Sequence, residues 1–144
     1  MLEIKTEEIL LQTRGFTDIV DITPQVAALL KKNEFSEGQV TIMVPGSTGG
    51  ITTIEYEPGL KKDLPEFFDS IIPQDRSYHH DQTWQDGNGY AHLRSALLKP
   101  SLTVPFMANS LLLGTWQQIV FVDFDNRKRN RRLIVQFIGV KKAG

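Results

Sequence analysis

The order of apolar and polar residues predicts a chain that begins with mixed elements and ends in a run of strands. Apolar positions favour a strand over Leu2–Gln12. A helix is expected next, because an apolar stripe recurs at helical spacing, with Thr23 as its cap and Pro24 in its first turn. Its end is expected near Asn33.

Two short β-rich segments and a second helix fill the middle of the chain. Strands are predicted over Gln39–Val44 and Ile51–Tyr56. A helix is predicted from Pro58 to Ile72, and Pro65 inside it should kink it or begin a new turn. The polar stretch from Pro73 to Asn88 is predicted to be a loop.

Past a short helix that carries His92, the chain becomes mostly strand. Short turns separate four predicted strands: Ser101–Met107, Ser110–Leu113, Gln117–Phe124 and Arg131–Val140. The predicted helices lie mostly in the first part of the chain and the closely connected strands in the last part. This order predicts an α+β fold, a largely antiparallel β-sandwich with two or three helices. The 144 residues suit one domain with one core, spanning residues 1–144.

Composition narrows the class of protein. The chain is 40% hydrophobic and 23% charged, which supports a folded core, and its net charge of -1 gives no general attraction to nucleic acid or membrane. With no cysteine it cannot form disulfides or thiolate zinc sites. The start of the chain lacks the pattern of a signal peptide, and no apolar run approaches the roughly 20 residues that span a bilayer. We therefore expect a soluble cytoplasmic protein without nucleic-acid or membrane partners.

Three histidines, His79, His80 and His92, are the first candidates for chemistry, because imidazole binds metals and carries protons near neutral pH. A loop that folds back could bring His80 and His92 to one cavity. Since His79 and His80 are adjacent, at most one of them is expected to face a given site. The spacing matches no metal signature, and on spacing alone histidines that only form hydrogen bonds are favoured.

The segment from Pro45 to Gly50 is rich in glycine and hydroxyl groups. Glycines let backbone N–H groups approach an anion, and Ser47 and Thr48 could add hydrogen bonds. A strand follows and there is no lysine, so this is not a P-loop, and a plain turn between strands is the favoured interpretation.

Two glutamates follow this segment. Alternation predicts Glu55 and Glu57 on one face of a strand, with Tyr56 on the other. One glutamate could act as a base, a magnesium ligand or an acceptor for a substrate amine. A solvated strand face is an equally good interpretation.

A basic run and a tryptophan complete the candidates. The run from Arg127 to Arg132 spans a predicted hairpin turn without interleaved aromatic residues, so we interpret it mainly as a solvated tip. One of its arginines could still contribute to a phosphate site or a subunit contact. Trp116 is interpreted as a packing or interface residue rather than a ligand-stacking one.

Several short segments together resemble the YjbQ-like family over almost the whole chain. They are Tyr78-His79-His80, Asn88 ahead of Ala91-His92-Leu93, Ser95-Ala96-Leu97-Leu98, Pro100-Ser101, Pro105 and Leu113-Gly114-Thr115-Trp116-Gln117. The resemblance implies a compact α+β fold built on a β-sandwich and assembled as a homotrimer. Members are often labelled secondary thiamine-phosphate synthases. The resemblance therefore implies a transferase that joins a pyrimidine diphosphate to a thiazole phosphate, giving thiamine phosphate and pyrophosphate.

The resemblance also implies site residues. The family's polar cluster corresponds here to Glu55, His80, Asn88 and His92, beside the loop of Ser47, Thr48 and Gly49. The implied roles are catalysis by His80, His92 and Glu55, and binding of a small phosphorylated metabolite by Ser47, Thr48, Gly49 and Asn88. His80 and His92 would also be the ligands of a divalent metal, Mg²⁺ or Zn²⁺.

This chain departs from the family pattern at two places. Many relatives have a histidine followed by two threonines where this chain has Gly46-Ser47-Thr48, so a third histidine ligand is absent. Relatives commonly have asparagine on each side of the glutamate, where this chain has Ile54 and Tyr56. Glu55, Asp81 or His79 could complete a metal site.

Two other functions remain open from the sequence. One is a metal-assisted hydrolase of a small phosphorylated or acylated metabolite, in which a metal-bound water lies next to Glu55. The other is a non-catalytic protein that binds a small ligand in the same pocket.

Overall fold

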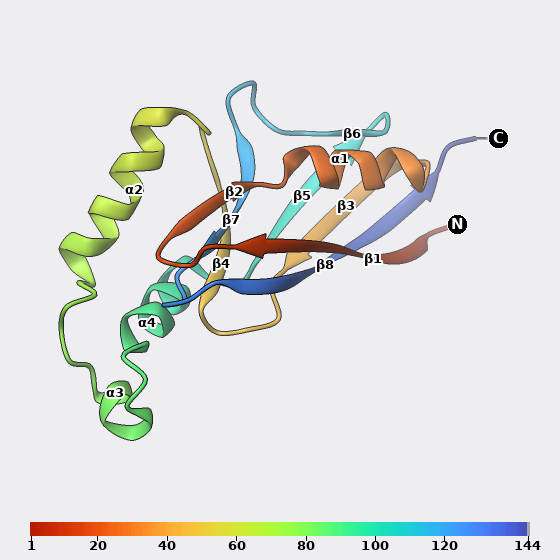
Figure 1. The fold of residues 1–144 in the computed structure, drawn as a ribbon. Coiled ribbons are helices and arrows are strands. Elements are labelled where there is room, and N and C mark those ends of the chain that lie inside the picture. Colours follow the sequence, from red (N-terminus) through yellow and green to blue (C-terminus); the bar gives the residue numbers. More distant parts are fainter. Residues whose placement is uncertain (144) are drawn as a thin grey trace.

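The computed structural model describes residues 1–143, whose strands form two sheets (Figure 1). In chain order the strands are β1 (Glu3–Thr13), β2 (Asp18–Asp21), β3 (Phe35–Met43), β4 (Gly49–Ile54), β5 (Ser101–Met107), β6 (Ser110–Leu111), β7 (Gln118–Asp123) and β8 (Arg129–Lys141). The larger sheet has the order β1-β8-β3-β5-β6 and the smaller one β2-β7-β4. Each of these strand pairs is antiparallel, which confirms the predicted α+β class.

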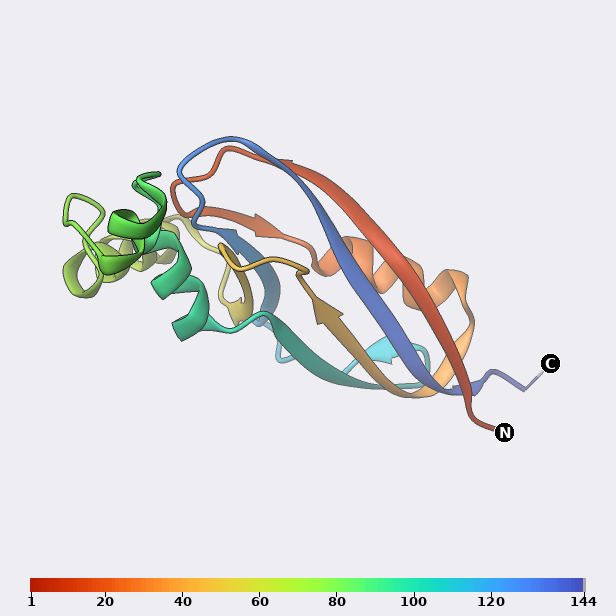
Figure 2. The same cartoon turned by 90° about the horizontal axis from the view of Figure 1, so that it is seen from below.

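Three of the helices lie together at one end of the molecule. The helices are α1 (Thr23–Lys32), α2 (Pro58–Ile71), α3 (His79–Trp84) and α4 (Gly89–Leu98). Both views place α2, α3 and α4 at one end, and the two chain termini at the other (Figures 1 and 2). Within residues 1–143, no helix has the length and apolar character needed to cross a membrane.

Strand β7 is the centre of the packing, because it is buried on both faces. Ile119 and Phe121 join the core between the two sheets, which also receives residues of α1 and β8. Val120 and Val122 point the other way, into a second core that Phe68 of α2 helps to form. The continuous apolar run of β7 follows from this position, since a strand covered on both faces has no polar side to alternate with.

Helix α1 begins one residue earlier than its sequence suggests. Ile22 occupies the N-cap position, and Thr23 is the first helical residue. The Thr23 hydroxyl instead accepts a hydrogen bond from the backbone N–H of Ile119, at 2.7 Å. The expectation that Thr23 caps the helix is therefore wrong, because its side chain is used to join α1 to β7.

The sequence prediction also misses helix α3, which lies inside the stretch expected to be a loop. The Asp81 carboxylate accepts hydrogen bonds from the backbone N–H of Tyr78 at 3.0 Å and of Gly89 at 2.8 Å. One carboxylate therefore fixes both the start of α3 and the start of α4. A six-residue helix held by such polar contacts carries too short an apolar pattern to be recognised in the sequence.

The structure of the segment that contains Glu55 and Glu57 also differs from the prediction. Strand β4 ends at Ile54, and Glu57 is the N-cap of α2, where its carboxylate accepts hydrogen bonds from the backbone N–H groups of Gly59 and Leu60. Glu55 and Glu57 are thus not partners on one strand face. Glu57 has a structural role, because a helix start leaves backbone donors that need an acceptor.

Candidate functional site

A buried arginine organises the end of the sandwich where α3 and α4 lie. Arg131 of β8 donates from Nε to Asp123 Oδ2 at 2.7 Å and from Nη2 to Asp123 Oδ1 at 2.8 Å. Its Nη2 also donates to the Thr48 hydroxyl at 2.7 Å, and that hydroxyl donates to Asp125 at 2.9 Å. The side chains of Arg131 and Asp123 are both buried, and such bidentate contacts fix the guanidinium in one orientation.

Three arginines of the basic run face the same side because they alternate along the chain. Arg127, Arg129 and Arg131 line one cavity, and all three guanidinium groups lie within 4.0 Å of the Asp125 carboxylate. Arg132 points to the opposite face of the sheet, where it pairs with Glu8 at 2.8 Å. The basic run is therefore divided between two faces. Arg131 is buried and Arg129 partly buried, whereas Arg127 stays largely exposed, as expected for a solvated tip, with 71% of its side chain accessible at the rim of the cavity.

The glycine-rich loop contributes only in part to this cavity. Gly46, Ser47 and Thr48 line it, but the Thr48 hydroxyl is buried and occupied by Arg131 and Asp125. Gly49 does not line the cavity, and a Cβ added there would lie 2.6 Å from the ring of Phe121. Close packing of β4 on β7, rather than approach of an anion, explains this glycine.

The structure brings His80 of α3 and His92 of α4 together. Their ring centroids are 4.2 Å apart, and His92 lines the cavity beside the arginines. Burial, followed by the nearby His80, lowers the pKa of His92 below its ordinary value. His79 is exposed, and of this pair His80 is the one beside His92; both lie on a helix rather than on the expected extended segment.

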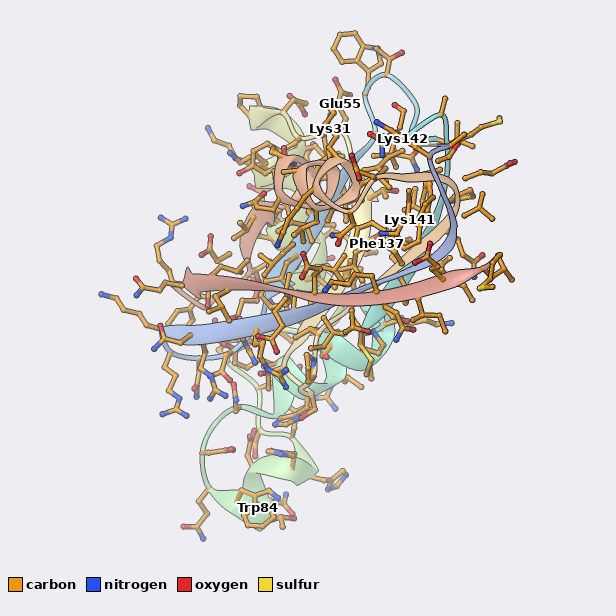
Figure 3. All side chains as sticks on the ribbon, turned by 90° about the vertical axis from the view of Figure 1, so that its right-hand side faces the viewer. Lys31, Glu55, Trp84, Phe137, Lys141 and Lys142 are labelled. Carbon is orange, nitrogen blue, oxygen red and sulfur yellow. The ribbon has the colours of Figure 1, made fainter. Side chains whose placement is uncertain are left out.

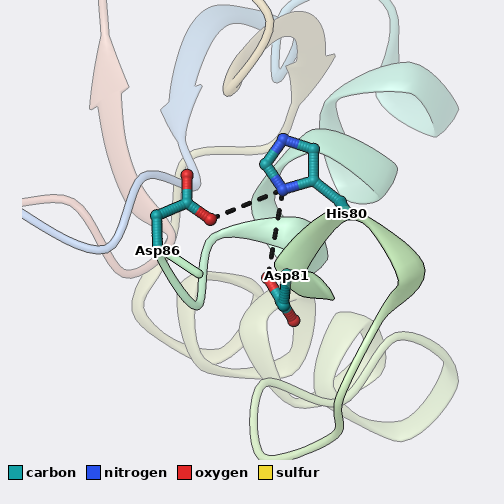
Figure 4. A group of neighbouring side chains, drawn as sticks. All are labelled: His80, Asp81 and Asp86. Carbon is teal, nitrogen blue, oxygen red and sulfur yellow. Dashed lines mark ion pairs between the residues drawn. The ribbon is translucent and has the colours of Figure 1, made fainter. Parts of the chain in front are cut away.

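His80 has two carboxylates beside its ring (Figure 4). Its Nδ1 lies 3.5 Å from Asp86 and 3.9 Å from Asp81, and it is buried without a hydrogen-bond partner among residues 1–143. Potential ligand atoms of the three residues all lie within 4.8 Å of one another. One nitrogen and two carboxylates form a donor set that fits a divalent cation.

The trio of His80, Asp81 and Asp86 shows whether a metal could be held here without the family histidine that Gly46 replaces. Asp81 and Asp86 supply the carboxylates near His80, whereas His92 lies next to the trio and is not one of its members. Asp81 is kept ionised, because hydrogen bonds from the backbone N–H groups of Tyr78 and Gly89 lower its pKa. The residues present therefore fit a metal without a histidine at position 46.

The cavity between these groups has a volume of about 550 Å³, enough for a small metabolite. Asn88 forms part of its wall, is largely buried, and accepts a hydrogen bond from the backbone N–H of Asn126 at 3.1 Å. This contact joins the start of α4 to the turn that carries Arg127. Asn88 and Ser47, two of the predicted substrate-binding residues, thus line the same cavity.

Glu55, like Gly49, is a predicted site residue that does not line this cavity. It is exposed after the end of β4, and Figure 3 labels it at the top of the view, with Trp84, the last residue of α3, at the bottom. Trp116 is also exposed, with 72% of its surface accessible. Within one copy of the chain, Glu55 is therefore not part of the cavity wall that His92 helps to form.

Sequence reasoning missed Asp86, Asp123 and Asp125 and assigned the arginines mainly to solvent. A partial signal was present in the alternation of Arg129 with Arg131, which places both on one face of β8, whereas Asp125 and Arg127 lie in the turn between β7 and β8. Asp86 had no comparable signal, because it lies in an irregular connection between two helices.

Comparison with known proteins identifies relatives along almost the whole chain. Residues 7–140 match the family described as UPF0047 protein YjbQ-like. A UPF0047 protein of Archaeoglobus fulgidus is 39% identical over 129 residues, covering 90% of this chain and 98% of that protein. The UPF0047 protein YugU of Bacillus subtilis is 34% identical over 137 residues, covering 94% and 99%.

Solved structures show the same architecture. A crystal structure of a YbjQ-like protein of unknown function from Sulfolobus solfataricus has a TM-score of 0.91 and 29% sequence identity, covering 96% of this chain and 99% of that chain. A hypothetical protein from Aeropyrum pernix has a TM-score of 0.87 and 28% identity, covering 94% and 98%.

Proposed function

From the premise that this chain belongs to the UPF0047 YjbQ-like family, we propose that it is an enzyme acting on small phosphorylated metabolites. The specific reaction that we propose is the joining of a pyrimidine diphosphate to a thiazole phosphate. The observation that carries this proposal is the placement of Arg127, Arg129 and Arg131 in the same cavity as His92. The glycine loop alone has no basic residue, and β8 with the turn before it supplies the positive charge that phosphate chemistry requires.

The proposed reaction is a substitution at the methylene carbon of the pyrimidine. The bond between this carbon and a diphosphate oxygen breaks, and the electron pair leaves with the diphosphate. The thiazole nitrogen donates its own pair to the same carbon and becomes the cationic nitrogen of thiamine phosphate. Since charge builds up on the departing diphosphate, donors fixed in place before the reaction lower the barrier.

The residues of the cavity divide between charge stabilisation and proton transfer. Arg127 and Arg129 would contact the departing diphosphate, and Asn88 and Ser47 would position the rest of the substrate. His92 would donate a proton to a diphosphate oxygen when its ring is protonated. His80 packs against His92 and sets its position, because the two rings lie 4.2 Å apart between centroids.

A divalent metal, Mg²⁺ or Zn²⁺, would be held by His80, Asp81 and Asp86 in this scheme. When bound, it would supply positive charge to the phosphate oxygens of the ligand. Arg127 and Arg129, which line the same cavity as Asp86, would contact the same phosphate group.

The test is an assay of thiamine phosphate and pyrophosphate formation by the purified protein, with and without added Mg²⁺. We expect His92→Asn to lower kcat by about 10²-fold, the usual range for loss of an acid–base group. His79→Asn is the matched control, because His79 is exposed on the same α3 helix as His80, and it should keep the wild-type rate. Equal rates for the wild type and His92→Asn, or no product under any condition, would sink this proposal.

A metal-assisted hydrolase is a second candidate, which the trio of His80, Asp81 and Asp86 favours. Here a metal-bound water would attack a phosphorylated or acylated substrate. Stoichiometric zinc that survives dialysis, together with ester hydrolysis, would support this function over the synthase. Binding of phosphorylated ligands without any turnover would instead identify a non-catalytic binding protein.

We propose that the protein acts in the cytoplasm as a homotrimer that assembles through the outer face of the five-stranded sheet. Leu10, Met43 and Ile138 are exposed, while Thr41 and Thr103 hydrogen-bond across this face. This largely apolar surface, on which Arg132 and Glu8 neutralise each other in an ion pair, suits burial between copies. Light scattering should show a trimer, and Leu10→Lys should shift the protein toward monomer. A monomeric wild type would contradict this assembly.

A further inference from the structure

Gly46 and Arg131 meet at the wall of the cavity. A Cβ added to Gly46 would lie 3.3 Å from Arg131 Nη1, so this nitrogen is directed at the loop that lines the cavity. The backbone of Gly46 has φ +152°, a conformation that other residues rarely adopt. Glycine thus leaves the end of this guanidinium uncovered.

The other two nitrogens of the Arg131 guanidinium already donate hydrogen bonds within the protein. Nε and Nη2 donate to Asp123 and Thr48, whereas Nη1 has no acceptor in the described part of the chain. The side chain is only 5% exposed, so the cost of desolvating it has already been met in the folded protein. A rigid donor with a free N–H group at a cavity wall is suited to a ligand oxygen.

The charges around Nη1 favour an anion. Arg127, Arg129 and Arg131 share Asp125, and Arg131 is paired with Asp123, so three positive groups meet two negative ones within residues 1–143. These five residues therefore carry one net positive charge. One more carboxylate lines the cavity. It belongs to Asp86 and lies 3.5 Å from His80 Nδ1.

We propose that Arg131 Nη1, uncovered by Gly46 and assisted by Arg127 and Arg129, forms a binding subsite for a phosphoryl or diphosphate group. The subsite deepens the function proposed above, since it assigns the phosphate end of the ligand to the arginine wall. The remainder of the ligand then lies toward His92 and Asn88. Ser47, at the exposed rim of the same loop, is available to donate a hydrogen bond to an outer phosphate oxygen.

Calorimetric titration of the purified protein with inorganic pyrophosphate, and separately with inorganic phosphate, tests this subsite without any need for turnover. Arg129→Gln should weaken pyrophosphate binding about tenfold or more, since it removes a charge-assisted contact. Arg132→Gln is the matched control, because Arg132 lies on the same strand but on the opposite face, and its affinity should equal that of the wild type. Tighter binding of pyrophosphate than of phosphate would identify the diphosphate as the group selected.

Gly46→Ala tests the role of the glycine directly, and we expect a loss of pyrophosphate affinity comparable to that of Arg129→Gln. If Gly46→Ala does not fold, Arg127→Gln and Arg129→Gln decide the outcome. Wild-type affinity in both arginine variants, or equal weakening by Arg132→Gln, would overturn the subsite. Because binding is measured alone, absence of thiamine phosphate formation would end the proposed reaction and leave the subsite intact.

Discussion

Arg131 and Asp123 form a two-point contact that joins β8 to β7 at the candidate site. The guanidinium donates to both carboxylate oxygens, at 2.7 Å and 2.8 Å, and both side chains are buried. Thr13 of β1 donates to the same carboxylate at 2.6 Å, so three strands from the two sheets meet at Asp123. The Arg131–Asp123 contact thus joins the two sheets and also orients the Arg131 guanidinium toward the cavity.

We predict that Asp123→Asn lowers the free energy of unfolding by about 3–5 kcal/mol, because it leaves the charge of Arg131 buried without its partner. Urea unfolding followed by circular dichroism measures this loss. Glu8→Gln is the control, since it breaks the exposed pair between Glu8 of β1 and Arg132 of β8 and should cost about 0–1 kcal/mol. Similar losses for the two variants would show that the buried pair does not organise this end of the fold.

The same contact predicts a dependence of stability on pH. Burial alone would raise the pKa of Asp123, but the hydrogen bonds from Arg131 and Thr13 outweigh it, so the pKa in the folded protein is lowered. A lowered pKa means that the unfolded chain binds the proton more readily. The stabilisation is therefore present above the unfolded pKa of about 3.9 and is lost as the pH falls through the folded pKa.

Unfolding by urea at several pH values between about 6 and 2 checks this sign, with the window set by the unfolded Asp pKa near 3.9. The wild type should lose stability more steeply than Asp123→Asn below pH of about 4. Parallel curves for the two proteins would mean that Asp123 titrates alike in both states. A wild type that gains stability in acid would reverse the predicted sign.

Much of the fold could be predicted because it depends on local apolar patterns. The strand Ser101–Met107 agrees at both ends, and α2 differs from its prediction by one residue, since both have a regular stripe with clear ends. Helix α3 and the short strand β2 could not be found in this way. They are held by contacts with distant segments, such as the pairing of β2 with β7, that no local pattern reveals.

The candidate site was predictable only where its residues lie close in sequence or share a family motif. His92 and Asn88 line one cavity with His80 packed beside His92, whereas Glu55 is exposed and does not line it. Arg131 reaches Thr48 across 83 positions of sequence. Such a contact depends on the order of strands in the two sheets, which the alternation of single residues does not determine.

Gly49 offers a test of whether a glycine of the loop serves packing or binding. We predict that Gly49→Ala lowers the free energy of unfolding by about 1–3 kcal/mol, because its Cβ would lie 2.6 Å from the Phe121 ring. Gly114→Ala should be nearly neutral, since its closest neighbour would be 3.7 Å away. Thermal unfolding compares the two. If folded Gly49→Ala loses pyrophosphate affinity while keeping wild-type stability, Gly49 belongs to the binding site instead.

The hydroxyl of Tyr78 forms a hydrogen bond and that of Tyr90 does not, so replacement by phenylalanine should have different effects at the two positions. The Tyr90 hydroxyl is buried without a hydrogen-bond partner among residues 1–143, and burial raises the pKa of Tyr90 to about 12. Its ring lies 5.0 Å from the Arg94 guanidinium, a contact that phenylalanine keeps. Tyr90→Phe should therefore leave the free energy of unfolding unchanged or raise it by about 1 kcal/mol, because an unpaired buried group is removed.

The Tyr78 hydroxyl donates to the carbonyl of Pro73 at 2.6 Å, so Tyr78→Phe removes a hydrogen bond that is made. That variant should lose about 0.5–1.5 kcal/mol in urea unfolding. Because both residues are buried tyrosines of the second core, the change in side-chain volume is the same in the two variants. An equal loss in Tyr90→Phe would mean that its hydroxyl does have a partner, such as an ordered water, and that this part of the core is more polar than the packing shows.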